Sequence, residues 1–199
     1  MNAFEEYVHD AVKAALAHID TAELADVYAL SFYLPQAEPR EPLLQVGYNT
    51  RSRVQACTPA PGQSAGWPTA SDAGEAAWNY AFWLQNELVW VPEPDSAGQA
   101  ILEEVLKGEG LWYTDEEADD DEDGCLAIAE QIDTRFADMC AAAARALHAS
   151  GAIEAMFGRA IPIIVHELEY HDRIVSLTEL ANPPALAGQF TAWVGSLYG

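Results

Sequence analysis

The apolar positions of the chain repeat with helical spacing in two long segments. Between residues 4 and 19, apolar side chains recur every three or four positions, and Asn2 with Glu5 resembles a capping box in front of them. A second segment follows the same spacing until Ser150 and Gly151 end it. Its apolar positions are Ile128, Ile132, Phe136, Met139, Ala143 and Leu147. Both segments are therefore predicted to form helices.

Shorter apolar runs predict two strands near the beginning of the chain. Residues 26–35, DVYALSFYLP, are apolar on both sides of an extended chain, which is typical of a strand covered on both faces. Residues 43–49, LLQVGYN, have a similar pattern. A polar turn between Pro35 and Pro42 joins the two runs, so they are predicted to form a hairpin with a long loop.

A third strand is predicted for residues 161–170, IPIIVHELEY, because this segment opens with β-branched side chains. Side chains alternate across a strand, so Glu167, Glu169 and His171 are expected on one face. The side chains expected on the opposite face are His166, Leu168 and Tyr170.

The remaining segments predict one loop and several helices. Residues 58–71 are rich in Pro, Gly and Ser and are expected to form a loop. Asp72 is predicted to cap a helix that continues to Leu84, another helix ends at Gly108, and a last one starts at Pro184. The expected fold is an α/β (α+β) domain, with a small mixed sheet of about three to five strands packed with several helices. Residues 1–199 are expected to form a single domain.

The charge of the chain is strongly negative. Its 199 residues include 9 Lys and Arg against 32 Asp and Glu, a formal net charge of −23. Such a chain repels phosphate backbones and anionic lipid surfaces, so neither nucleic acid nor a membrane is expected as a partner. A basic protein is the partner that this charge favours. An acidic proteome, as in organisms that live in salt, is the alternative origin of the charge.

The chain is expected to be cytoplasmic. Its first ten residues, MNAFEEYVHD, have neither the basic region nor the apolar core of a signal peptide. No stretch approaches the roughly 18 apolar residues of a membrane span. The cysteines Cys57, Cys125 and Cys140 are odd in number and form no CxxC motif, so reduced and buried thiols are expected.

The most acidic part of the chain is residues 115–123, where every position except Ala118 is Asp or Glu. We expect residues 115–124 to form an acidic loop that is either simply solvated or attracts a basic partner over a distance. The predicted partner-binding residues are Asp115, Glu116, Glu117, Asp119, Asp120, Asp121, Glu122 and Asp123.

The same run contains the spacing of a calcium-binding loop. The pattern D-x-D-x-D-G-x5-E is matched by Asp119, Asp121, Asp123, Gly124 and Glu130. A run so rich in Asp satisfies three of these positions by composition alone, and no second loop accompanies it. Calcium binding is therefore the alternative to a partner-binding surface, and no resident metal or cofactor is expected.

A histidine pair near the third strand resembles the zinc motif of metalloproteases but has the wrong spacing. Two ligands on one helix face must be four residues apart, whereas His166 and His171 are five apart. A further alternative is an enzyme of unknown class with Glu167, Glu169 or His171 in a cleft, where Glu169 and a histidine would form an acid–base pair. No nucleophile or phosphate-binding motif supports a reaction, so a non-enzymatic function is favoured.

The few basic residues and the many aromatic ones each allow two interpretations. Arg51 and Arg53 follow the second predicted strand, with Arg40 upstream, and either line an anion pocket or balance the charge of an acidic surface. Most large aromatic side chains are expected in the core, with one or two exposed as anchors for a partner. These residues are Trp78, Tyr80, Trp83, Trp90 and Trp112.

Three stretches carry a resemblance to a known family. They are VYALSFYL, the strand end Tyr48-Asn49-Thr50, and IPIIVHELEYHD followed by Ala181-Asn182-Pro183. Together they resemble the bacterial family catalogued as domain of unknown function 4303, similar in style to small α/β immunity proteins found beside secreted toxins. This resemblance implies a cytoplasmic α/β domain that inhibits a toxin, and it implies no catalytic residues. The expected function is a non-enzymatic acidic binding protein, an immunity protein that neutralises a basic toxin domain.

Overall fold

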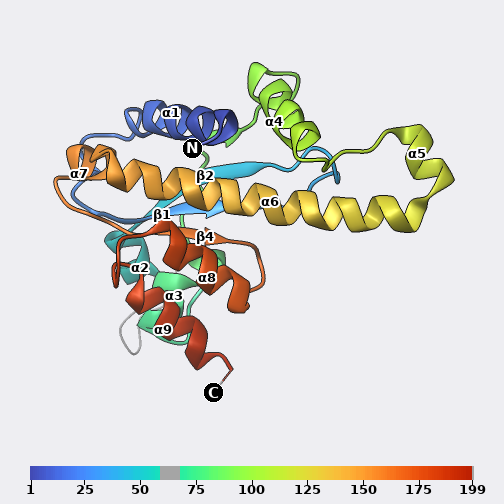
Figure 1. Cartoon of the computed structure of the whole chain (residues 1–199). Helices are drawn as coiled ribbons and strands as arrows, with labels where there is room; N and C mark the ends of the chain where they lie inside the picture. The colour runs from blue at the N-terminus through green and yellow to red at the C-terminus, as the bar shows by residue number, and fades with distance from the viewer. Residues whose placement is uncertain (59–67, 199) are drawn as a thin grey trace.

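A four-stranded mixed β-sheet lies at the centre of the computed structural model, which describes residues 1–58 and 68–198 (Figure 1). Its strands are β1 (Val27–Tyr33), β2 (Leu44–Thr50), β3 (Val89–Val91) and β4 (Ile163–His166), in the order β3-β2-β1-β4. β1 pairs with β2 as an antiparallel hairpin and with β4 in parallel, while β3 lies antiparallel to β2. The sheet therefore joins the beginning of the chain to its last third.

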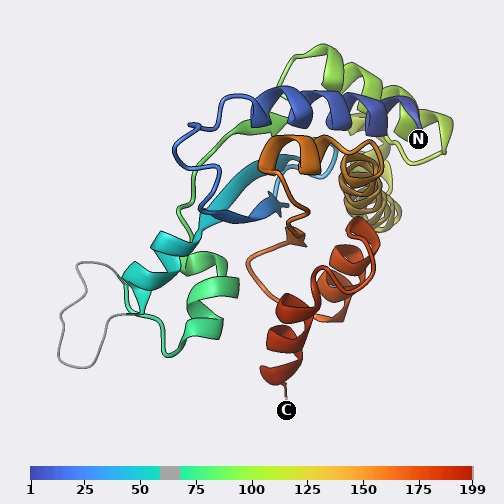
Figure 2. The same cartoon turned by 90° about the vertical axis from the view of Figure 1, so that its left-hand side faces the viewer.

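One face of the sheet is apolar. Side chains alternate between the two faces of a strand, and the apolar residues occupy the alternate positions on this side. Leu30 and Phe32 of β1 point to this face, and Val46 and Val165 lie opposite Phe32 on the two neighbouring strands. All four side chains are fully buried. The helices α1 (Ala3–Leu16), α4 (Ala97–Gly108) and α6 (Glu122–Ala149) cover this side, as Figure 2 shows.

The other face carries the buried polar side chains of Ser31, Gln45, Asn49 and His166. It faces α2 (Arg51–Cys57), α3 (Ala73–Trp78), the 3-10 turn η1 (Tyr80–Phe82) and α9 (Gly188–Ser196), while α8 (Asp172–Ala181) lies beside β4 (Figures 1 and 2). The short helices α5 (Asp115–Asp120) and α7 (Ala152–Phe157) precede and follow α6. No helix within the described ranges combines the length and the apolar character that crossing a membrane requires.

The outer edge of β4 is closed by side chains of α8 and its C-terminal cap rather than by another strand. The hydroxyl of Thr178 accepts from the N–H of Val165 at 3.1 Å and donates to the Val165 carbonyl at 3.0 Å. One helical turn later, Asn182 Oδ1 accepts from the N–H of Ile163 at 2.9 Å, and Nδ2 donates to the Ile163 carbonyl at 2.7 Å. These two side chains therefore satisfy the backbone groups that a fifth strand would satisfy.

A second asparagine, just before the start of β3, closes the edge of β2. Asn86 Oδ1 accepts from the N–H of Tyr48 at 2.8 Å, and Nδ2 donates to the Tyr48 carbonyl at 3.2 Å. The Asn86 backbone approaches the strand so closely that a Cβ at Gly47 would lie 2.5 Å from its carbonyl oxygen. Glycine is therefore required at position 47.

The predicted fold class is confirmed, as are the hairpin, the capping box of α1 and the long helix α6. Most of the loop predicted for residues 58–71 falls on residues 59–67, which lie outside the described residues. The helix predicted to reach Leu84 instead ends at Trp78, because the extended backbone of Asn79 separates α3 from η1. The short elements β3 and α2 were not predicted, since three and seven residues show too little periodicity.

The prediction of an acidic loop at residues 115–124 is wrong, because this segment is helical. α5 begins with a capping box, in which Thr114 Oγ1 accepts from the N–H of Glu117 at 3.2 Å and the Glu117 carboxylate accepts from the N–H of Thr114 at 2.8 Å. Asp121 then caps α6 by accepting from the N–H of Gly124 at 3.0 Å. Most of the acids thus stand in first helical turns, where free N–H groups favour negative charge.

Replacing Asn182 with Ala should destabilise the protein by about 2–4 kcal/mol, because the buried N–H and carbonyl of Ile163 would lose their partners. The free energy of unfolding in urea measures this loss. The matched control is Ser176→Ala on the exposed side of α8, which should change stability by less than about 0.5 kcal/mol. Equal losses in the two variants would contradict the edge-closing role of Asn182.

Candidate functional site

The predicted partner-binding residues lie together on a projecting surface. This surface, named here the acidic arm, consists of residues 115–123 in α5 and the first turn of α6, beyond the end of the sheet (Figure 1). All eight of its carboxylate side chains are exposed. Asp115 pairs with Arg40, and the other seven have no ion pair with any residue that the structure describes. The arm therefore presents almost uncompensated negative charge, while its role in binding stays a prediction.

The calcium-loop interpretation of the same segment is wrong. Its ligands would have to curl around one ion, but Asp119 lies in α5, whereas Asp123 and Glu130 are spaced along α6. Nowhere in residues 1–58 and 68–198 are three His, Cys, Asp or Glu side chains grouped so that they could share a metal ion. The helical caps described above explain why the segment does not form a loop.

An acidic groove of about 780 Å³ lies between the segment after β1, the middle of α6 and the segment after β4. Its carboxylates are those of Asp133, Glu167 and Glu169, and His171 lies beside them. Its apolar wall is formed mainly by Leu34, Pro35, Pro42, Leu43, Phe136 and Leu168. The structure therefore brings together the three residues that the sequence offered for an enzymatic cleft and adds Asp133, which the sequence analysis missed.

The charges in this groove act on one another. The Glu167 carboxylate lies 3.7 Å from Nε2 of His171, so Glu167 rather than the expected Glu169 pairs with a histidine. Burial raises the pKa of Asp133, the nearby carboxylate of Glu167 raises it further, and Arg173 lowers it. Asp133 therefore holds a proton more readily than a solvated aspartate does.

Residues 167–170 do not continue β4, so the two alternating faces predicted for them are wrong. β1 ends at Tyr33, shortly before Pro35, and its parallel partner β4 ends at the paired residue His166. Beyond this point the chain after β4 has no strand of the sheet to pair with. The chain then turns, and the Tyr170 hydroxyl donates to the Trp78 carbonyl at 3.2 Å and accepts from the N–H of Tyr80 at 2.8 Å. This turn directs both glutamates of the segment into the acidic groove.

A buried serine and histidine meet on the polar face of the sheet. Ser31 Oγ lies 2.8 Å from Nε2 of His166, and Nδ1 of His166 lies 3.0 Å from the carbonyl oxygen of Glu167. A carbonyl can only accept, so Nδ1 carries the proton and Nε2 accepts from the serine hydroxyl. A catalytic serine and its general base would form the same hydrogen bond. Here, however, both side chains are only 1% exposed, and burial lowers the pKa of His166 to about 4. The pair therefore joins β1 to β4 and is closed to substrate.

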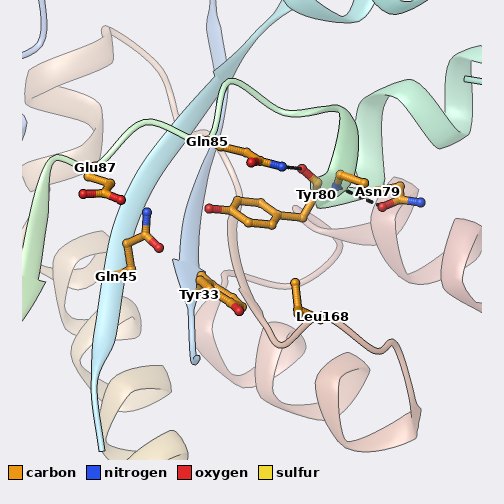
Figure 3. A pocket seen from close by; sticks show the side chains of 8 residues that line it. Tyr33, Gln45, Asn79, Tyr80, Gln85, Glu87 and Leu168 are labelled. Atoms are coloured by element: carbon orange, nitrogen blue, oxygen red, sulfur yellow. Dashed lines mark hydrogen bonds between the residues drawn. The ribbon is translucent and has the colours of Figure 1, made fainter. Parts of the chain in front are cut away.

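Aromatic rings cover this pair and border a small pocket. Tyr33 and Tyr80 stack with ring centroids 5.1 Å apart, and the Tyr80 ring lies 4.7 Å from that of His166. The pocket, of about 370 Å³, lies beside the two tyrosines, and the side chains of Gln45 and Glu87 extend toward it from β2 and the segment before β3 (Figure 3). Burial raises the pKa of both tyrosines, so they stay protonated and offer hydroxyl groups rather than nucleophiles.

The aromatic residues expected mainly in the core fall into two groups. Trp78 and Trp83 are buried, whereas Tyr80, Trp90 and Trp112 are half-buried. Beside the acidic arm, Arg40 and Lys107 lie 5.9 and 5.2 Å from the ring centroid of Trp112. Trp112 is therefore already engaged by cations within the chain.

The three arginines considered for an anion pocket do not lie together. Arg40 donates to the Tyr113 carbonyl at 3.1 Å and pairs with the acidic arm. Arg53 in α2 donates to the Phe82 carbonyl at 2.8 Å. Arg51 lines a different cavity, which it shares with Arg159.

Comparison of the chain with models of protein families, with curated proteins and with solved structures gives no match in any of the three. The resemblance to the family of domain of unknown function 4303 accordingly stays a prediction. The roles of the groove and of the acidic arm must therefore be inferred from their geometry and charge.

The substitution His166→Gln should remove a pH dependence of stability. The buried imidazole stays neutral down to about pH 4, whereas in the unfolded chain it takes up a proton near pH 6.5. The folded state therefore loses stability as the pH falls through this window, by about 2 kcal/mol between pH 8 and pH 5. The difference in unfolding free energy between the wild type and the variant should therefore be smaller at pH 5 than at pH 8 by that amount. An advantage that is independent of pH would contradict the lowered pKa.

The substitution Glu167→Gln should lower the pKa of Asp133, because it removes a negative charge that disfavours ionisation of the aspartate. Arg173→Gln should have the opposite effect, since the guanidinium favours the ionised form. An NMR titration of the Asp133 carboxyl carbon measures both shifts. Glu179→Gln, an exposed change on α8, is the control that should leave this pKa unchanged. No shift in Glu167→Gln would show that Glu167 does not face Asp133.

Proposed function

We propose that this chain is a non-enzymatic acidic binding protein, an immunity protein that neutralises a basic toxin domain. The acidic arm is the observation that carries the proposal, because seven of its eight exposed carboxylates have no cationic partner among the described residues. Like charges held so close repel one another and cost stability. A cationic protein surface that binds here would reduce this repulsion, and the reduction would contribute favourably to the free energy of binding.

The position of the acidic arm favours rapid association. It lies at the end of the molecule, where a partner can approach without meeting the rest of the fold (Figure 1). The net charge of −23 extends the attraction beyond the arm itself. Complementary charge raises association rates about 10- to 1000-fold, and salt weakens the effect.

The acidic groove supplies a second contact for the same partner. A Lys or Arg side chain matches it, because the aliphatic stem would lie on the wall of Leu34 and Phe136 while the charged end would lie among the carboxylates. The segment between β1 and β2, which forms this wall, also carries Arg40, the partner of Asp115. Groove and acidic arm are thus linked through one segment, and a basic surface can contact both.

The remaining support comes from the cysteines and from the family resemblance. Cys57, Cys125 and Cys140 are free and buried, as expected in the reducing cytoplasm. The resemblance to toxin-immunity proteins provides the class of partner, and an acidic inhibitor would mimic the phosphate field that basic nucleic-acid toxins bind. The proposal therefore places the complex in the cytoplasm.

An enzymatic function is the second candidate, because one observation favours it. The acidic groove places Asp133, whose pKa is raised, beside the pair of Glu167 and His171. Groups with altered pKa values in a groove are typical of acid–base chemistry. The two candidates differ in a simple way, since Asp133→Asn would abolish turnover by an enzyme but would only weaken a binding protein.

Removing four charges from the acidic arm should slow association with a basic toxin domain roughly tenfold or more at low salt. The variant combines Glu116→Gln, Asp119→Asn, Asp120→Asn and Glu122→Gln, which are exposed and do not cap a helix. The measurement is stopped-flow fluorescence with basic nuclease-toxin domains, including any encoded beside this gene, at rising sodium chloride concentrations.

The matched control removes four exposed carboxylates outside the acidic arm, through Glu6→Gln, Glu93→Gln, Glu154→Gln and Glu179→Gln. It changes the net charge equally and should slow association less than the arm variant does. Equal effects of the two variants would show that only net charge matters. An association rate that ignores salt would contradict electrostatic attraction altogether.

A further inference from the structure

A cavity of about 600 Å³ lies at the N-terminal ends of β1 and β4, at the opposite end of these strands from the acidic groove. Residues of α2, α3, the segment before β4 and the turn before α9 line it. Two of the nine basic residues of the chain, Arg51 and Arg159, are among them. A cavity with two arginines is unexpected in so acidic a protein.

The two guanidinium groups of this arginine cavity converge on one acceptor. Arg51 Nη1 donates to the carbonyl of Ala25 at 3.1 Å, and Arg159 Nη2 donates to the same oxygen at 3.2 Å. Arg159 is held further by the carbonyls of Val27 and Phe157. The backbone thus holds two like charges side by side, an arrangement that repels itself unless an anion joins it.

The described residues that line the cavity do not supply that anion. None of the described residues that line the cavity has a carboxylate, and neither arginine forms an ion pair with a described residue. The nearby carboxylate of Asp26 accepts from the backbone N–H of Ser52 at 3.1 Å and forms no ion pair with either described guanidinium group. Their planar N–H groups match the oxygens of a carboxylate or a phosphate.

The rest of the arginine cavity is suited to an apolar body. Trp78, Val54, Ile161 and Leu186 form apolar walls. The hydroxyl of Tyr28 is already used, because it donates to the Ala77 carbonyl and accepts from Asn49. The two arginines are therefore the charged groups that remain for a ligand, and the volume lies in the range of small-molecule sites.

We propose that the arginine cavity binds a small organic acid, in which a carboxylate or phosphate group is attached to an aromatic or aliphatic body. Arg51 and Arg159 hold the anionic group, and Trp78 with Val54 and Leu186 contacts the body. The site is independent of the basic-partner proposal, because it lies at the other end of the strands and takes a ligand of opposite charge.

Isothermal titration calorimetry with phenyl phosphate and with benzoate tests this site and distinguishes the two anionic groups. At least one of them should bind with one-to-one stoichiometry at millimolar concentration or below, and phenol, which lacks the charge, should not. Arg51→Gln and Arg159→Gln should each weaken binding at least about tenfold. Arg51 is exposed, so its variant is expected to fold even if Arg159→Gln does not.

The matched control is Arg145→Gln, which removes one positive charge from an exposed position outside the cavity. It should bind the probe as the wild type does. Absence of binding by both anions to the wild type would overturn the proposal. It would also be overturned if Arg51→Gln bound the probe normally, or if Arg145→Gln lost as much affinity as Arg51→Gln.

Discussion

The fold depends on how its small sheet is closed at the edges. A strand edge exposes unpaired N–H and carbonyl groups, which must find partners in the chain, in water or in another protein. Here Thr178 and Asn182 serve the edge of β4, and Asn86 serves the end of β2. These side chains lie 13, 19 and 38 residues from the strand residues they serve, so each edge is completed only when the following segment folds against its strand.

The two faces of the sheet are held by different interactions, and the candidate sites lie at the ends of the strands. The apolar face, with Phe32 at its centre, is buried beneath α1 and α6 and supplies most of the core. The polar face is held by the hydrogen bond between Ser31 and His166 and by the aromatic rings above it. The acidic groove and the arginine cavity lie at the two ends of the parallel pair β1 and β4. The same pair of strands thus positions both candidate sites.

The helices α1 and α6 and the hairpin could be predicted from the sequence. Their buried apolar side chains leave a regular pattern along the chain. The sequence misled at the acidic segment, where the charged composition favoured a loop although Thr114 and Glu117 form a capping box that the sequence already shows. The acidic groove could be predicted only in part. Asp133 looks like any polar helix position until the fold brings it to Glu167, and Arg159 likewise joins Arg51 only through their shared backbone acceptor.

The separation of the two candidate sites contributes to an electric dipole along β1 and β4. Carboxylates gather at the C-terminal ends of β1 and β4, and two guanidinium groups lie at the N-terminal ends. A dipole rotates in the field of a charged body before the surfaces touch. A basic protein that approaches from any direction would therefore turn this one so that the groove leads. More encounters would then begin with the acidic groove facing the partner, and fewer would begin with another face.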